Sequence, residues 1–200
     1  MIRHVIFDIG QVLIDVLLTE FLEKFAAAFQ VDPSVIISNS QNGAHIDFMT
    51  GKVSGEEFYQ RTTQHFNYSI PLQDFKNLWI QMLGEQKDDT ARIVKLLSEK
   101  NYNLSLLSNI DPWHFEYCEQ NYPVLKAFNR KFVSFKLKLK KPDPEIFIKV
   151  ASELKSDPQD CLLIDDKLEN VDSAKKVGFQ AVQFIDAGQL REWLKKRGIL

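Results

Sequence analysis

The sequence has few cysteines, no long apolar run and almost no net charge, and each of these absences excludes a class of protein. Its 200 residues include two cysteines, Cys118 and Cys161, which lie far apart and outside any CxxC or Cys/His pattern. This argues against a disulfide scaffold or a cysteine metal site and indicates reduced thiols. No stretch approaches the roughly 20 apolar residues of a membrane-spanning helix, and the N-terminal residues do not resemble a signal peptide. We therefore expect a cytoplasmic protein with no membrane partner.

The charge balance argues against a nucleic-acid partner. The chain has 25 basic and 27 acidic residues, which gives a net charge of -2, so no overall field attracts polyanions. Lys136, Lys138 and Lys140 alternate with apolar residues, and we interpret this run as an exposed, strand-like face and not as a nucleic-acid patch. Any anionic ligand must therefore be attracted locally.

The first residues predict a buried central strand that ends in a carboxylate. The run Val5-Ile6-Phe7 is apolar and includes β-branched and aromatic side chains, which favours a strand of a parallel sheet buried on both faces. Asp8 then falls at the carboxyl end of this strand. In open α/β sheets, ligands bind at that end, in the crevice where the strand order reverses. Asp8 is therefore a candidate site residue, although a surface Asp that closes a strand would give the same pattern.

Residues 16–84 and the rest of the chain differ in the spacing of their apolar residues. Between residues 16 and 84, apolar residues recur at helical spacing, Ser54-x-x-Glu57 has the form of a capping box, and no strand pattern is evident. From residue 85 onward, helix and strand patterns alternate, as they do in βα units around a parallel sheet. We predict an α/β core formed by residues 1–15 and 85–200, with residues 16–84 as an α-helical insert.

Polar side chains follow the later strands of the predicted core, as Asp8 follows the first. In chain order they are Ser108, Asn109, Lys141, Asp165 and Asp166. Because parallel strands present the same end to the same side of a sheet, we expect these groups to meet Asp8 at one edge. Two adjacent carboxylates in a cleft are costly unless a cation neutralises them, so Asp165-Asp166 is the most informative pair.

Four motifs, taken in order, resemble those of the haloacid dehalogenase superfamily. They are FDxGxVL at residues 7–13, LLSN at 106–109, KPDPEIF at 141–147 and IDDxxxN at 164–170. Most members of that superfamily are phosphatases that work through an aspartyl-phosphate. The resemblance implies a Rossmann-like three-layer parallel sheet of strand order 3-2-1-4-5 with residues 16–84 as an inserted helical C1 cap. The pattern is most similar to sugar-phosphate phosphatases that include glucose-1-phosphate phosphatases, and more distantly to the phosphatase domain of epoxide hydrolases.

The resemblance also implies roles for individual residues. Asp8 would be the nucleophile, and Lys141 would be a second catalytic group that bridges Asp8 and the phosphate. Ser108 and Asn109 would bind phosphoryl oxygens together with Lys141, because donors aimed at developing charge lower the barrier. The implied activity is hydrolysis of a small phosphorylated metabolite, such as a sugar phosphate, through an aspartyl-phosphate intermediate.

A divalent cation is expected beside these groups. Three carboxylates and a phosphate dianion carry five negative charges, and Lys141 supplies one positive charge, so an unneutralised site would repel its substrate. Mg²⁺ fits such a site because it prefers oxygen ligands. By resemblance, its ligands are the side chains of Asp8 and Asp166 and the backbone carbonyl of Gly10, with Asp165 in support beside them.

One position departs from the superfamily pattern. Its phosphatases usually carry a second Asp two residues after the nucleophile, as general acid and base, and here that residue is Gly10. Such assistance is worth typically about 10²–10⁴ in rate. A phosphate-binding or regulatory protein with weak or no turnover is therefore the alternative function. His45 and His114 have no metal-ligand spacing, and the sequence leaves open whether either reaches a substrate. It also leaves the oligomeric state open.

Overall fold

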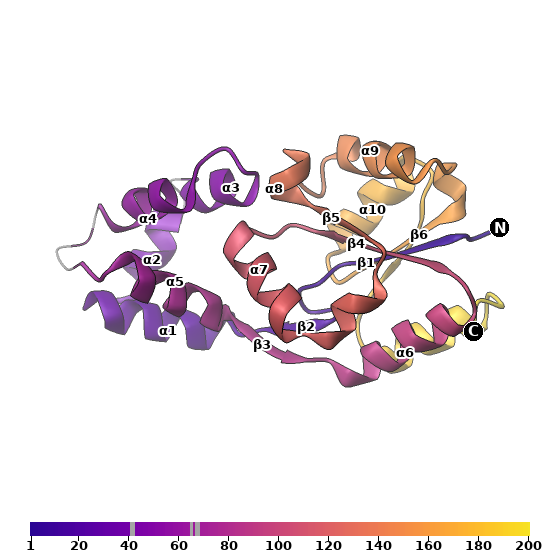
Figure 1. The fold of residues 1–200 in the computed structure, drawn as a ribbon, viewed down its shortest axis with the longest axis horizontal. Coiled ribbons are helices and arrows are strands. Elements are labelled where there is room, and N and C mark those ends of the chain that lie inside the picture. Colours follow the sequence, from indigo (N-terminus) through magenta and orange to yellow (C-terminus); the bar gives the residue numbers. More distant parts are fainter. Residues whose placement is uncertain (41–42, 65, 67–68) are drawn as a thin grey trace.

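The computed structural model describes residues 1–40, 43–64, 66 and 69–200. Its larger sheet is parallel, and the strands are β1 (His4–Phe7), β4 (Asn103–Ser108), β5 (Arg130–Val133), β6 (Cys161–Asp165) and β7 (Gln180–Gln183). They lie in the order β5-β4-β1-β6-β7 (Figure 1). This order is 3-2-1-4-5 when the five strands are numbered along the chain. The predicted α/β fold class and strand order are therefore confirmed.

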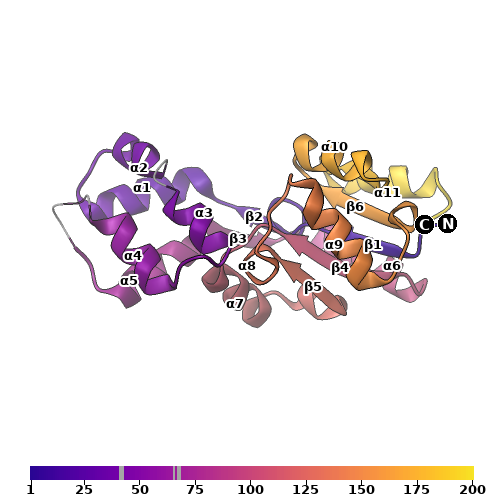
Figure 2. The same ribbon diagram turned by 90° about the horizontal axis from the view of Figure 1, so that it is seen from above.

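Strand β1 is the centre of the sheet and is buried on both faces. Val5, Ile6 and Phe7 are each 0% exposed. Because side chains alternate across a strand, Val5 and Phe7 join one hydrophobic cluster and Ile6 joins another on the opposite face. Helices cover both faces, which gives the three layers seen in Figures 1 and 2. These helices are α6 (Asp88–Glu99), α7 (Pro112–Asn121), α9 (Pro144–Leu154), α10 (Leu168–Lys176) and α11 (Ala187–Lys195).

The inserted segment forms helices around an aromatic core of its own. They are α1 (Leu18–Phe29), α2 (Pro33–Ser40), α3 (Ala44–Met49), α4 (Gly55–Thr63) and α5 (Leu72–Trp79). Phe21 and Phe25 of α1 pack edge-on against Trp79 and Phe75 of α5, with ring centroids 5.4 and 5.5 Å apart. Figures 1 and 2 place these helices at the end of the core where the parallel strands finish. The insert therefore covers the edge on which the candidate site residues lie.

The junction between insert and core contains two strands that the sequence did not predict. Strand β2 (Ile14–Val16) pairs antiparallel with β3 (Leu83–Gln86), directly after a 3₁₀ turn at Ile80–Met82. The prediction that residues 16–84 contain no strand was therefore wrong at both ends of the insert, since β2 includes residue 16 and β3 includes residues 83 and 84. Strands of three and four residues are too short to show alternation, and here the pairing between distant segments creates them. The boundaries of the two domains stay a prediction.

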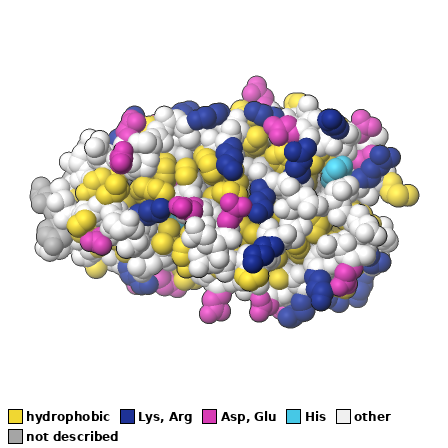
Figure 3. Space-filling model, in the orientation of Figure 1, with side chains coloured by type: hydrophobic (Ala, Val, Ile, Leu, Met, Phe, Trp, Pro, Cys, Tyr) yellow, Lys and Arg dark blue, Asp and Glu magenta, His cyan; other side chains and the backbone are white. Residues whose placement is uncertain are grey.

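The lysine-rich run after β5 was also interpreted wrongly. Residues 134–137 form a short helix, α8 (Ser134–Leu137), instead of an exposed strand. Leu137 is buried, and Lys138 ends the helix in a left-handed conformation with φ 61°. The alternation of apolar residues and lysines over residues 135–140 therefore falls on one helical turn and the loop after it, and not on a strand. On the face drawn in Figure 3, basic and acidic side chains are interspersed.

No helix in the described ranges is long and apolar enough to cross a membrane. The cellular location that we expect from the sequence stays a prediction.

Candidate active site

The carboxyl edge of the sheet brings the predicted acidic residues together. Asp8 follows β1, and Asp165 ends β6, the strand beside it. Carboxylate oxygens of Asp8, Asp165 and Asp166 all lie within 4.8 Å of one another. Neighbouring parallel strands in register account for this, since Phe7 of β1 pairs with Ile164 of β6. The carboxyl ends of neighbouring strands therefore bring these three carboxylates together.

Lys141 enters the cluster from the loop between α8 and α9. Its Nζ lies 3.0 Å from Asp8 Oδ2 and 2.5 Å from Asp165 Oδ2, and it donates to the Leu107 carbonyl at 2.8 Å. The side chain is buried. Burial alone would lower the pKa of Lys141, but the two carboxylates outweigh it and raise that pKa. Lys141 is therefore a fixed positive charge between two buried carboxylates.

The carboxylate of Asp8 is buried, and nearby positive charge offsets the effect of this burial only in part. Burial raises its pKa to about 6, against the opposing effect of Lys141. The backbone N–H of Ile9 donates to Asp8 Oδ1 at 2.7 Å, and the buried Ser108 hydroxyl faces the carboxylate as a donor. Asp8 is thus held from several sides in one orientation, next to the end of β4.

Asp165 and Asp166 have different environments although they are adjacent. Asp165 is 0% exposed, and its oxygens accept hydrogen bonds from the backbone N–H of Lys167 (3.0 Å), from Asn170 Nδ2 (2.8 Å) and from Lys141. Asp166 is half-buried and forms no ion pair with any described residue. Burial, and next the neighbouring Asp165, raise the pKa of Asp166. Asp166 therefore has a free carboxylate, whereas Asp165 is occupied by protein donors.

The residues around this cluster fit a hydrated divalent cation. Three carboxylates with one lysine leave an excess of negative charge, and their oxygens are the ligands that Mg²⁺ prefers. Asn170 is 2% exposed, and its Oδ1 has no hydrogen-bond partner in the described structure, although its Nδ2 binds Asp165. Buried acceptors are rarely left unpaired. A water molecule bound to a cation would supply the missing donor.

Asn109 is engaged differently from the role that the resemblance implies. Its Nδ2 donates to the Lys141 carbonyl at 2.7 Å, and its Oδ1 accepts from the Lys141 N–H at 2.8 Å. Both ends of the amide therefore fix the backbone of Lys141. Binding of phosphate by the Asn109 amide stays a prediction, and its observed contacts make it a positioning residue for Lys141.

Gly10 lies in the turn after Asp8 and bridges to Ile14. Its φ is outside the left-handed region, and a Cβ added there would lie 3.2 Å from Val16 Cγ2. A side chain at this position would therefore require only a small shift of Val16 and no unusual backbone conformation.

Sequence reasoning missed a buried polar cluster that joins insert and core. Asp111 caps α7 through Oδ1, which accepts from the N–H groups of Trp113 and His114 at 3.0 Å each. Its Oδ2 lies 2.6 Å from His114 Nδ1 and accepts from Trp79 Nε1 at 3.0 Å. His114 Nε2 lies 2.9 Å from the Trp79 carbonyl. The sequence alone does not reveal this cluster, because Trp79 reaches Asp111 from a distant segment.

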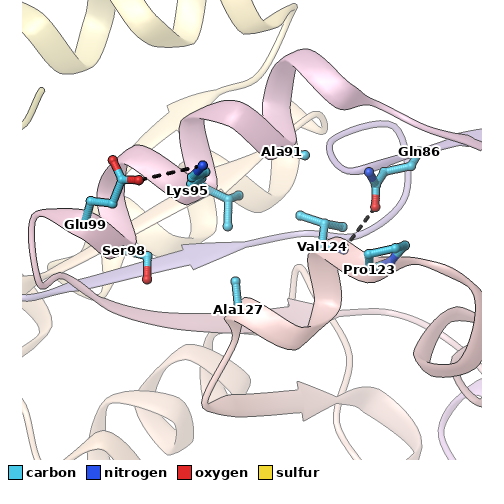
Figure 4. Close-up of a pocket in the computed structure, with 9 residues that line it drawn as sticks. Gln86, Ala91, Lys95, Ser98, Glu99, Pro123, Val124 and Ala127 are labelled. Carbon is cyan, nitrogen blue, oxygen red and sulfur yellow. Dashed lines mark hydrogen bonds and ion pairs between the residues drawn. The ribbon is translucent and has the colours of Figure 1, made fainter.

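A separate groove lies between α6 and the 3₁₀ turn at Pro123–Ala127 (Figure 4). Gln86 accepts a hydrogen bond there from the N–H of Val124, and Lys95 pairs with Glu99. The lining of this groove includes none of the candidate site residues Asp8, Gly10, Ser108, Asn109, Lys141, Asp165 and Asp166. It is therefore not part of the candidate active site.

A parallel α/β sheet with an inserted helical cap and an acidic cluster at its carboxyl edge is the architecture of a particular class of hydrolases. A model of the haloacid dehalogenase-like hydrolases matches residues 2–178. The chain belongs to this family, and it is therefore a hydrolase.

Known relatives agree with this assignment. The chain is 25% identical over 191 residues to a D-ribitol-5-phosphate phosphatase of Bacteroides thetaiotaomicron, covering 92% of each chain. A haloacid dehalogenase family enzyme of the same organism, solved as a magnesium complex, is 25% identical over 94% of both chains, with a TM-score of 0.83. A predicted hydrolase of the family from Porphyromonas gingivalis is 25% identical and has a TM-score of 0.84, covering 100% of this chain and 98% of its own.

Proposed function

We propose that this chain is a Mg²⁺-dependent phosphatase that hydrolyses a small phosphorylated metabolite through an aspartyl-phosphate on Asp8. The observation that carries this proposal is the bridging position of Lys141 Nζ, between Asp8 and Asp165 at the end of the central strand. A nucleophilic carboxylate at this position has the ammonium group of Lys141 beside it and the free carboxylate of Asp166 nearby to bind a metal ion. The similarity to a ribitol-phosphate phosphatase supports a phosphate monoester as substrate.

The reaction follows from the oxygens at this edge. A carboxylate oxygen of Asp8 attacks phosphorus, a new O–P bond forms, and the bond from phosphorus to the ester oxygen breaks. The departing oxygen takes a proton from water. A second water molecule then attacks the phosphorus of the acyl-phosphate, its proton passes to the hydroxide left by the first step, and the bond from phosphorus to Asp8 breaks to release inorganic phosphate and the Asp8 carboxylate. Lys141 and Ser108 stabilise the charge on the phosphoryl oxygens.

Asp8, Asp166 and the backbone carbonyl of Gly10 would hold the metal ion in this proposal. When bound, Mg²⁺ neutralises the repulsion between the carboxylates and the incoming phosphate. Asp165 supports the site without being a ligand, because Lys141, Lys167 and Asn170 already occupy its oxygens.

Removing Asp165 and removing Asp166, one at a time, should weaken Mg²⁺ binding to different extents. Asp166→Ala should weaken Mg²⁺ binding roughly tenfold or more, since a ligand is lost. Asp165→Ala should affect Mg²⁺ binding less and thermal stability more, because buried donors lose their acceptor. Calorimetric Mg²⁺ titration and thermal unfolding of both variants would test this, with Asp172→Ala at an exposed site on α10 as control. Equal or reversed losses of affinity would overturn the ranking.

The alternative is a phosphate-binding or regulatory protein with little turnover, motivated by Gly10. Hydrolysis of an aryl phosphate in the presence of Mg²⁺ separates the two. The proposal predicts steady turnover that a chelator abolishes and that Mg²⁺ restores. Binding of phosphate without turnover, under the same conditions, would favour the alternative.

Gly10→Asp should accelerate hydrolysis of esters with poor leaving groups more than of aryl phosphates. The new carboxyl group would protonate the departing oxygen, which matters only when that oxygen is strongly basic, and the gain is up to about 10²-fold. Parallel kinetics with an alkyl and an aryl phosphate, beside thermal unfolding, measure the effect. Gly10→Ala is the matched control, because it introduces the same contact with Val16 without an acid. A folded Gly10→Asp variant with unchanged rates for both esters would show that the missing acid is not limiting.

A sugar or polyol phosphate fits both the motif pattern and the named substrate of the ribitol-phosphate relative. The expected branch of sugar-phosphate phosphatases stays a prediction. Screening phosphorylated metabolites against the purified protein would identify the substrate.

A further inference from the structure

Helix α3 of the insert is seated on the loop that follows Ser108. Ser134 Oγ, in α8, donates to the carbonyl of Met49 at the end of α3 (2.6 Å) and accepts from the N–H of Ile110 (3.1 Å). Figures 1 and 2 both draw α3 beside α8, at the edge where the strands end. Helix α3 is therefore linked through Ser134 to the loop that follows Ser108, the candidate phosphate-binding residue at the end of β4.

His45, in the first turn of α3, faces this loop. Its Nε2 lies 3.9 Å from Asp111 Oδ2, and Asp111 is three residues after Ser108. The ring packs edge-on against Trp79, with centroids 5.2 Å apart, and lies 6.3 Å from the Phe58 ring. The side chain nevertheless stays 42% exposed. Aromatic rings and a carboxylate therefore cover part of the imidazole, and the remainder is open to solvent.

The groups around Asp111 leave His45 with a ring nitrogen that can accept a hydrogen bond from a ligand. His114 has a carboxylate at one ring nitrogen and a carbonyl at the other, so both nitrogens carry protons. This imidazolium holds the pKa of Asp111 well below its usual range, although burial alone would raise it. Burial lowers the pKa of His45, and neither of its ring nitrogens forms a hydrogen bond with a described residue. A neutral imidazole has one ring nitrogen that accepts a hydrogen bond.

We propose that His45 is a specificity-determining residue that accepts a hydrogen bond from a hydroxyl group of the leaving group, with Asp111 as the residue that orients it. The inference rests on the proposed phosphatase function. With the phosphoryl group beside Ser108, the rest of a small substrate extends toward the cap, where His45 offers an exposed acceptor. An unprotonated nitrogen between aromatic rings selects a donor such as a hydroxyl, so the substrate class is a hydroxylated phosphate monoester.

The test compares two esters that differ only in hydroxyl groups. Ribitol 5-phosphate and n-pentyl phosphate have the same chain length, and the ratio of their kcat/KM values measures recognition of the hydroxyl groups. His45→Ala should lower this ratio roughly fivefold or more, the effect of one lost hydrogen bond. In His45→Gln, which keeps a hydrogen-bond acceptor, the ratio of the two kcat/KM values should fall less than in His45→Ala. Ile46→Ala, at an exposed neighbour on the same helix, is the control.

The outcomes separate this inference from the proposed function. A ratio that falls in His45→Ala and is partly restored in His45→Gln supports the inference. An unchanged ratio, or an equal fall in Ile46→Ala, overturns it while Asp8-dependent hydrolysis still supports the phosphatase. Absence of Asp8-dependent hydrolysis of either ester, with or without Mg²⁺, overturns the proposed function and this inference with it.

Discussion

Replacing Asp8 with asparagine is expected to lower kcat for phosphate esters by about 10⁴-fold or more and to leave the protein folded. The amide is nearly isosteric with the carboxylate but is a poor nucleophile, so the covalent intermediate cannot form. The fold should tolerate the change, because Asp8 is a buried carboxylate whose pKa is already raised to about 6. Steady-state kinetics with an aryl phosphate, together with thermal unfolding, measure both effects.

The control for this variant is the same change at a position away from the site. Asp172 is exposed on α10, and Asp172→Asn should hydrolyse the ester at the wild-type rate. An Asp8→Asn protein that turns over phosphate esters as fast as Asp172→Asn would show that Asp8 is not the nucleophile.

Lys141→Met is expected to lose both activity and stability. The substitution removes the ammonium group that contacts Asp8, Asp165 and the Leu107 carbonyl, and leaves two buried carboxylates without their cation. Breaking one partner of a buried ion pair costs about 3–5 kcal/mol. The free energy of unfolding should fall by about this amount in the absence of metal, and Mg²⁺ should restore part of it by neutralising the same carboxylates. Denaturant unfolding with and without Mg²⁺ measures the loss and its recovery.

Lys140→Met is the matched control, because Lys140 is the adjacent residue and is only half-buried. It should change stability little and keep activity, since partly exposed charges contribute little to the free energy of folding. A Lys141→Met protein as stable as Lys140→Met, with or without Mg²⁺, would contradict the account of Lys141 as the compensating charge of the site.

The acidic edge could be predicted from the sequence because local patterns specify it. The apolar run before Asp8 is long enough to identify a central strand, and the apolar residues before Asp165 identify its neighbour. Parallel strands then bring their carboxyl ends to one side, so the meeting of these groups follows from the strand pattern alone. The strand order required the resemblance to a known family.

Contacts between distant segments could not be predicted in the same way. The strands β2 and β3 exist because they pair with each other across the insert, and neither has a pattern of its own. Trp79 and Asp111 are 32 residues apart and meet only when the insert docks. The contact between the Asn109 amide and the Lys141 backbone also depends on the path of a later loop, so the motif that contains Asn109 does not reveal it.

Chemical trapping during turnover would show directly whether a covalent intermediate forms on Asp8. Borohydride reduces an acyl-phosphate to an alcohol, so trapping during turnover converts a phosphorylated aspartate into homoserine, which peptide mass spectrometry locates. We expect homoserine at residue 8, dependent on both Mg²⁺ and the phosphate ester, and none at Asp165 or Asp166. Unmodified Asp8 in a protein that is actively hydrolysing the ester, or homoserine at another aspartate, would contradict the assignment of Asp8 as the nucleophile.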